Sequence, residues 1–342
     1  MIVKNHSLKP LLLYTMTSAL GDFLIMSDVM KKVEEIVSDS RCLMAHRSNP
    51  HVSLWRYDDY SKRFFDVFSG AQIWQMMRML RVAAAEGYRR FGLQMAPGSI
   101  QGYLFQSVLK SLGCLDYVVD FNLINADIIV PRRGDYIFDI HINQIQDLFG
   151  LCAQDVQANF ALPLAIQDVS DRGSRKYRIG IHPWSRRSQY SGFTWPDECW
   201  VALLKELSTH SDVEVVLFGK DATFDEFLRE MSSRTDFESR ITAVPSESVR
   251  QLINTISGLD LLISVNTSVV HIGHALQKKM VILTGPSLEM WVPKSARIRI
   301  VRDPLAVFPG VDRHMGDSYF PSVSRILVAD VINAIKEIEE SW

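Results

Sequence analysis

The chain has 342 residues, of which 47% are hydrophobic and 22% charged, and its formal net charge at pH 7 is -2. This length favours two hydrophobic cores over one, and the composition is that of a folded globular protein. The near-neutral charge argues against a nucleic-acid-binding protein, which would carry a strong basic excess.

The cysteines and the apolar runs indicate the cellular compartment in which the protein works. The four cysteines lie far apart with no C-x-x-C pair, which suits neither a zinc site nor a disulfide framework and favours a reducing cytosol. The apolar run Leu11–Tyr14 is too short for a signal peptide, and no run approaches the roughly 20 apolar residues that span a bilayer. We therefore expect a soluble cytoplasmic protein, which could still work peripherally at the inner face of a membrane.

The first half alternates short apolar strands with longer amphipathic helices, the rhythm of a parallel α/β fold. Apolar residues at helical spacing predict helices from about 23 to 37, at 71–86 and at 102–112. The expected strands are 11–16, 91–95 and 117–119, and the segments 127–130 and 141–151 complete this half. These elements predict a first domain over residues 1–165.

A polar passage at 166–176 is the best candidate for a linker, and the alternation of strands and helices restarts after it. The expected strands are 177–182, 213–218, 259–265 and 280–284, and the expected helices are 197–209, 223–233 and 269–276. We therefore predict a second domain over 177–325, followed by a C-terminal helix within 326–342.

The turn after the first strand carries small residues and one acid. Ser18 and Gly21 allow a ligand to approach the backbone closely, and Asp22 stands at the start of the helix, where its charge meets the positive end of the helix dipole. Asp22 is either a helix cap or a carboxylate that acts as a general base, and its position alone does not separate the two.

A second turn joins the strand 259–265 to a helix. Asn266, Thr267 and Ser268 are residues that favour a helix start, and free N–H groups there suit a phosphate. His271, about one turn further on, could add a donor to the same anion. The alternative is an ordinary capped helix with a structural histidine.

A third candidate follows the strand 177–182. Ser185, Arg186 and Arg187 suit a diphosphate, although a solvated charged loop would have the same composition. For the basic segment 294–302 we expect simple surface exposure.

Taken in order, several segments resemble glycosyltransferase family 9, the bacterial ADP-heptose transferases of lipopolysaccharide synthesis. The matching segments are 18–22, 179–183, 194–200, 218–221, 260–276 and 279–287. The most specific is 260–276, where the family has an acidic residue, an apolar strand, Asp-Thr-Gly-x-x-His and then Ala-Ala-Leu.

The resemblance implies a GT-B fold, in which two Rossmann-like parallel-sheet lobes face a central cleft, with the acceptor mainly on the N-terminal lobe and the nucleotide sugar mainly on the C-terminal one. It implies that Asp22 is the catalytic base, with Ser18 and Gly21 on the acceptor side, and that Asp221 holds the ribose. The residues expected around the donor are Ser185, Arg186, Arg187, Asp221, Asn266, Thr267, Ser268, His271, Gly285 and Pro286.

Two departures from the family pattern bear on the donor. Asn266-Thr267-Ser268 stands where the family usually has Asp-Thr-Gly, and Phe193 stands where it often has a lysine that contacts the donor phosphates. Arg186 or Arg187 could substitute for that lysine.

The expected reaction is the inverting transfer of a sugar, by family habit heptose from ADP-heptose, to a hydroxyl of a glycan or glycolipid. We expect no cofactor and no metal, because no D-x-D pair is evident and protein groups can stabilise the leaving diphosphate. The alternatives are a protein that binds a sugar nucleotide without turnover and a nucleotide-sugar epimerase of the same architecture.

Overall fold

The structure is a computed structural model, and it describes residues 9–15, 20–46, 62–94, 100–120, 126–151, 176–183, 194–219, 224, 227–229, 241–285, 289–303 and 323–339. The chain divides into two compact units, Met1–Pro163 and Leu164–Trp342. The expected linker at 166–176 lies, except for Lys176, outside the described residues, and our domain boundaries remain predictions.

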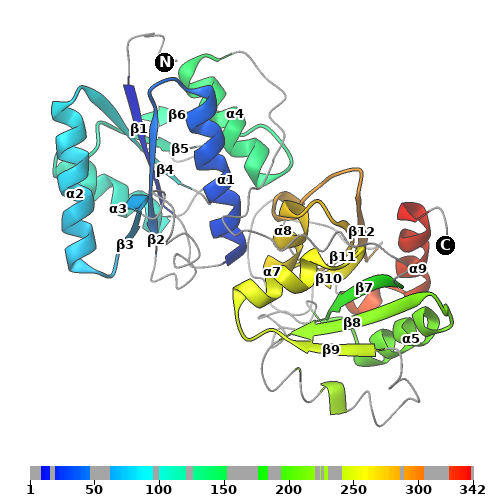
Figure 1. Cartoon of the computed structure of the whole chain (residues 1–342). Coiled ribbons are helices and arrows are strands. Elements are labelled where there is room, and N and C mark those ends of the chain that lie inside the picture. The colour runs from blue at the N-terminus through cyan, green and yellow to red at the C-terminus, as the bar shows by residue number, and fades with distance from the viewer. Residues whose placement is uncertain are drawn as a thin grey trace. The chain divides into compact units, whose positions relative to one another are not determined.

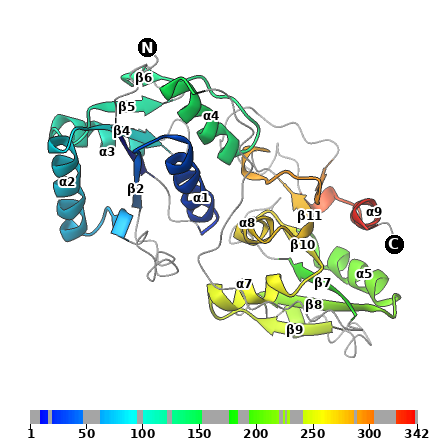
Figure 2. The same cartoon turned by 45° about the horizontal axis from the view of Figure 1, so that its top comes forward.

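The first unit holds a six-stranded parallel sheet in the order β3-β2-β1-β4-β5-β6. Helices α1 (Leu20–Ile36) and α4 (Ile137–Phe149) cover one face, and α2 (Gly70–Ala85) and α3 (Ile100–Ser111) cover the other (Figure 1, Figure 2). The strands are β1 (Lys9–Thr15), β2 (Arg41–His46), β3 (Phe64–Asp66), β4 (Tyr88–Gln94), β5 (Tyr117–Asp120) and β6 (Ile128–Ile129).

Alternation along the strands explains this layering. Successive side chains of a strand point to opposite faces, so Leu11 and Leu13 of β1 pack under α2 and α3, against Met76 and Leu80. On the other face, the helical spacing that predicts α1 places Phe23 and its apolar stripe in the core, fully buried.

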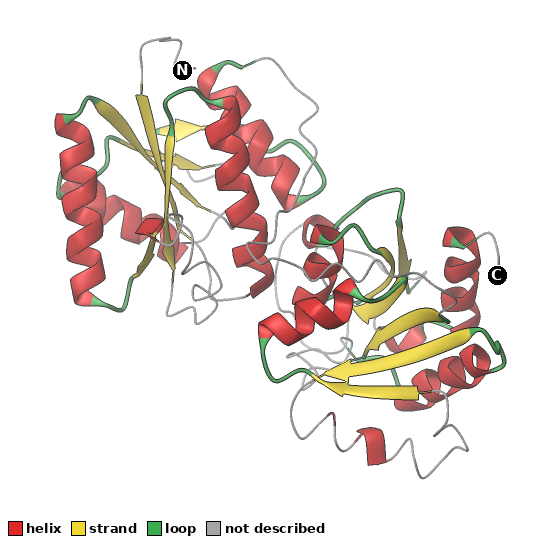
Figure 3. Cartoon of the chain, in the orientation of Figure 1, coloured by secondary structure: helices red, strands yellow, loops and turns green. Residues whose placement is uncertain are grey.

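The second unit repeats the arrangement, with the sheet order β12-β11-β10-β7-β8-β9. Helices α5 (Asp197–Ser208) and α9 (Val328–Ile338) cover one face, and α7 (Val249–Ser257) and α8 (Ser268–Ala275) cover the other (Figure 3). The strands are β7 (Tyr177–His182), β8 (Val213–Gly219), β9 (Ile241–Pro245), β10 (Leu261–Val265), β11 (Lys279–Thr284) and β12 (Ile298–Arg302), and short 3-10 turns occupy Glu289–Trp291 and Val323–Arg325. The predicted α/β class is confirmed in both units.

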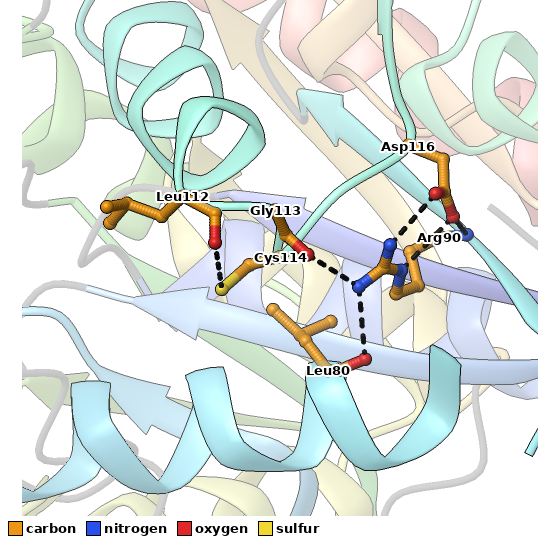
Figure 4. A network of polar contacts seen from close by, with 6 residues as sticks. All are labelled: Leu80, Arg90, Leu112, Gly113, Cys114 and Asp116. Carbon is orange, nitrogen blue, oxygen red and sulfur yellow. Dashed lines mark hydrogen bonds and ion pairs between the residues drawn. The ribbon is translucent and has the colours of Figure 1, made fainter. Parts of the chain in front are cut away.

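A buried arginine ties the first sheet to two of its connections. Arg90 of β4 is 8% exposed and donates to Asp116 at 2.8 Å, to the carbonyl oxygen of Gly113 at 2.8 Å and to that of Leu80 at 3.5 Å (Figure 4). Burial acts to raise the pKa of Asp116, but the hydrogen bonds from Arg90 outweigh it and hold this pKa below its ordinary value. This network joins β4 to α2 and to the turn before β5.

The structure adds elements that the sequence reading did not identify: β2 and β3 in the first sheet, and β9, α7 and β12 in the second. The expectation of simple surface exposure for 294–302 is wrong for its second half. Residues 298–302 form β12, in which Ile298 and Val301 are buried, because the sheet supplies an edge for them to pair with. Of the helix expected at 223–233, residues 224 and 227–229 are described and are helical.

Candidate active site

Both sheets reverse their strand order at the same point. The first strand of each unit has the second strand on one side and the fourth on the other, so the order turns back between β1 and β4 and between β7 and β10. Connections from these two strands leave in opposite directions, which opens a crevice at their carboxyl ends where ligands of open α/β sheets bind. We call these places the first and second switch points.

At the second switch point, Thr267 begins α8. Its hydroxyl oxygen accepts a hydrogen bond from the N–H of Val269 at 3.3 Å, and the N–H of Asn266 donates to the carbonyl oxygen of Leu283 at 3.0 Å. The Thr267 hydroxyl still has its own proton to donate. Asn266, Thr267 and Ser268 are all half-buried, so the start of α8 presents hydroxyls and helix N–H groups together.

His271 is the fourth residue of α8, and its side chain is buried, with 6% of the residue exposed. Burial, with a smaller contribution from His274, lowers the pKa of His271 to about 3, so the ring is neutral near pH 7. Its Nδ1 is buried and has no hydrogen-bond partner among the described residues. A neutral imidazole carries no positive charge but can donate one N–H, so a contribution of His271 to an anion site would be that of a hydrogen-bond donor.

Polar side chains also stand at the carboxyl ends of β7, β10 and β11, on the face of the sheet that α8 covers. Ser264 Oγ lies 3.5 Å from His182 Nδ1, and burial lowers the pKa of His182 to about 4. Thr284 Oγ1 ends β11, buried and without a hydrogen-bond partner in the described part of the chain, and the buried Gly285 follows it. We did not single out Ser264 or Thr284 from the sequence, although a polar residue at the end of an apolar strand is the signal that could have found them.

A glycine sets the distance between α8 and the sheet. A Cβ atom on Gly273 would lie 2.5 Å from Met280 Sδ and 2.8 Å from Leu262 Cδ2, closer than side chains pack. The close approach this glycine permits lets α8 pack directly against β10 and β11.

At the first switch point, α1 follows β1 and carries Asp22 in its first turn. Gly21 is buried and Asp22 half-buried, so the carboxylate stands at the carboxyl edge of the sheet, beside the positive end of the helix dipole. This is the position that the sequence predicts for a base held at a ligand site.

A row of polar side chains lies beside this point, facing α3. Thr15 pairs with Gln94, and Asp120 extends the row from β5. Gln94 is 1% exposed and both of its amide atoms lack a hydrogen-bond partner among the described residues. Behind the row, the side-chain amide of Gln106 donates to Thr15 Oγ1 at 3.1 Å and to the carbonyl oxygen of Leu93 at 2.7 Å. The sequence reading missed this row.

Several expected site residues cannot be placed. Ser18, Ser185, Arg186, Arg187, Asp221 and Pro286, together with Phe193, lie outside the described residues. Within the described ranges, no three or more His, Cys, Asp or Glu side chains are grouped so that they could hold a metal ion. The structure therefore gathers Asn266, Thr267, Ser268, His271 and Gly285 at one switch point, and Gly21 and Asp22 at the other.

The fold is that of GT-B glycosyltransferases. A glycosyltransferase of family 9 from Veillonella parvula has a TM-score of 0.70 and 14% identity, with 98% of each chain covered. Escherichia coli heptosyltransferase WaaC with ADP has a TM-score of 0.65 and 14% identity, with 96% of this chain and 100% of that chain covered. Escherichia coli ADP-heptose lipopolysaccharide heptosyltransferase II has a TM-score of 0.61 and 17% identity, with 96% and 98% covered.

The sequence itself identifies the protein family. Residues 136–314, more than half of the chain, match the model of glycosyltransferase family 9 (heptosyltransferase). The chain belongs to this family, and it is a heptosyltransferase-like glycosyltransferase. Among curated protein sequences there is no significant match.

Proposed function

We propose that the protein transfers a sugar from a nucleotide diphosphate to a hydroxyl of a glycan or glycolipid, with inversion at the anomeric carbon. The observation that carries the proposal is the start of α8 at the second switch point. There the Thr267 hydroxyl and helix N–H groups accompany a buried nitrogen of His271 that has no hydrogen-bond partner among the described residues. Hydrogen-bond donors without an acid among them suit a diphosphate.

ADP-heptose is the donor we propose. Solved structures of Escherichia coli WaaC contain ADP and ADP-2-deoxy-2-fluoro heptose, and this chain shares its fold and family. In the proposed complex, Asp221 holds the ribose, while Ser185, Arg186, Arg187 and Pro286 complete the donor site formed by Asn266, Thr267, Ser268, His271 and Gly285.

The leaving diphosphate gains negative charge as the bond to the sugar breaks. We propose that the hydroxyls of Thr267 and Ser268, the His271 N–H and the arginines stabilise this charge without a metal ion or other cofactor. Donors fixed in place before the reaction act at full strength in the transition state, because they need no reorganisation.

On the acceptor side, Asp22 takes the proton of the attacking hydroxyl. That oxygen bonds to the anomeric carbon from the face opposite the diphosphate, and the diphosphate leaves with the bonding electron pair. Ser18 and Gly21 give the acceptor room beside the carboxylate. We propose that the reaction takes place in the bacterial cytoplasm, next to the membrane that carries lipid-linked acceptors.

The test is the release of ADP from ADP-heptose by the full-length protein, with and without a glycolipid extract as acceptor. We expect release that depends on the acceptor and a product of inverted anomeric configuration. Tight binding of ADP-heptose without release would show a binding protein, and release of ADP with an altered free sugar and no acceptor would show an epimerase. Either result would overturn the proposal.

A further inference from the structure

The face of the first unit formed by α2 and α3 exposes an unusual number of large apolar side chains. Trp74 is 67% exposed and Leu104 57%. Val82, Val108 and Leu112, which directly follows α3, are also exposed. In the second unit, α7 and α8 follow the corresponding strands, and none of their described residues is an exposed large hydrophobic. Exposed large apolar side chains gathered on one face of a unit are a feature of interaction sites in soluble proteins.

The outward side of α2 combines this apolar surface with positive charge. Met76, Met77 and Leu80 face the core, and the opposite side of the helix lines a shallow hollow formed by Trp74, Gln75, Arg78, Arg81, Val82 and Ala85. Trp74, Arg78 and Arg81 follow one another at spacings of four and three residues, so they share one side of the helix. A tryptophan beside two arginines suits a boundary between an apolar layer and water.

No acidic side chain of α2 or α3 neutralises the positive charge on this face. The sequences of α2 and α3 contain no Asp or Glu. Some other basic side chains of the described chain have acidic partners, as Arg133 has Asp147, Arg299 has Glu337 and Lys110 of α3 has Asp127. Arg78 and Arg81 form no ion pair with any described residue. An extended surface of negative charge would complement both.

We propose that the α2–α3 face docks on an anionic lipid bilayer. Arg78 and Arg81 bind headgroup phosphates, while Trp74 and Val82 of α2 and the exposed leucines and valine of α3 enter the interfacial layer. A bilayer fits better than a protein partner, because the apolar side chains are spread along two helices and the accompanying charge is of one sign, without a deep groove in the described residues of either helix. The proposal concerns the outward sides of α2 and α3 and does not depend on the proposed reaction.

The experiment is sedimentation of the full-length protein with vesicles of phosphatidylcholine alone and with vesicles that also contain phosphatidylglycerol. We expect binding to the anionic vesicles and little to the neutral ones. Replacement of Arg78 and Arg81 by Gln should weaken that binding about 30-fold, since each cation near an anionic surface contributes roughly fivefold. Trp74→Ala should weaken it by about tenfold or more.

The matched control replaces Lys205 of α5 and Lys336 of α9 by Gln, which removes the same charge from exposed positions of the second unit. It should bind like the wild type, and all variants should keep the wild-type melting temperature because the changed side chains are exposed. Equal binding to neutral vesicles, or an α2 double variant that binds like the wild type, would overturn the proposal. It would also be overturned if the wild type were a dimer that Trp74→Ala dissociates, since a second copy of the chain would then cover this face.

Discussion

The two units of the molecule have the same strand order but different chemistry at the same place. In the first unit the polar row beside the switch point is Thr15, Gln94 and Asp120, and in the second it is His182, Ser264 and Thr284. In both, the helix after the fourth strand adds a buried polar side chain, Gln106 on α3 and His271 on α8. Each has one atom without a hydrogen-bond partner in the part of the chain that the structure describes.

The difference lies in charge. The first switch point has two carboxylates, Asp22 and Asp120, whereas the second has imidazoles, hydroxyls and the amide of Asn266, with no acid among them. A carboxylate can take a proton from a sugar hydroxyl, but the same group beside a diphosphate would repel it. In the proposed reaction the two units, which share one fold, therefore have different roles. The base lies on the first and the anion site on the second, because only the side chains at the strand ends need to differ.

The largest expected effect is on Asp22. Asp22→Asn keeps a side-chain oxygen at the start of α1 but removes the proposed base, so transfer should slow by about 10²–10⁴-fold while the melting temperature stays close to the wild type. The measurement is the transfer rate together with the melting temperature on the same sample. Glu35→Gln changes an exposed acid of the same helix and should leave the rate unaltered. An active Asp22→Asn enzyme would make Asp22 a helix cap.

The second expected effect compares a buried ion pair of the first unit with an exposed one of the second. Arg90→Ala leaves Asp116 without its partner and should lower the free energy of unfolding by about 3–5 kcal/mol. Arg299→Ala breaks the exposed pair with Glu337 and should cost less than about 1 kcal/mol. Chemical denaturation measures both, and equal costs would contradict the structural role of Arg90.

The third expected effect separates helix capping from donor binding. Thr267→Ala and Ser248→Ala each remove a capping hydroxyl, from α8 and α7, and each should lower the stability by about 1 kcal/mol. Only Thr267→Ala should also weaken the binding of ADP, by roughly 1.5–3 kcal/mol, because it removes a hydrogen bond to a charged phosphate. If the two variants bound ADP equally well, Thr267 would be a cap alone.

The smallest expected effect concerns Asp28, a buried acid on α1. Burial is the main reason that its pKa rises from 3.8 to about 6. The folded protein thus holds a proton that the unfolded chain has already lost, and stability falls as the pH rises from about 4 to 6. Asp28→Asn should therefore stabilise the fold by about 1–2 kcal/mol at pH 8 and by little at pH 3.5. Melting curves at both pH values test this, and a loss of stability at pH 8 would contradict it.

The elements that the sequence predicts best are the ones with strong apolar periodicity. The strand expected at 177–182 coincides with β7, and the strand-helix-strand segment after residue 259 corresponds to β10, α8 and β11. β10 and β11 are buried along nearly their whole length, so their apolar signal is almost continuous. In β7 the buried Ile179 and Ile181 alternate with other residues, which is also a strand signal.

The elements that were missed lie mostly at sheet edges, where one side faces solvent and the apolar run is short. β3 has three residues, and β12 alternates arginine with apolar residues, which resembles a charged surface segment. For α7 a signal was present, since Ser248 and Gln251 form a capping box. The polar rows could not be predicted as clusters, because their members come from strands far apart in the chain and meet only through the sheet register.

The division of the reaction between the two units is tested most directly by calorimetric titration of ADP into the wild type, Asp22→Asn and His271→Ala, with His274→Ala as the control on the same helix. The account predicts that ADP binds the wild type, Asp22→Asn and His274→Ala with the same affinity, and binds His271→Ala roughly 10–100-fold more weakly. An affinity that falls in Asp22→Asn and is unchanged in His271→Ala would contradict it, as would a wild-type protein that does not bind ADP.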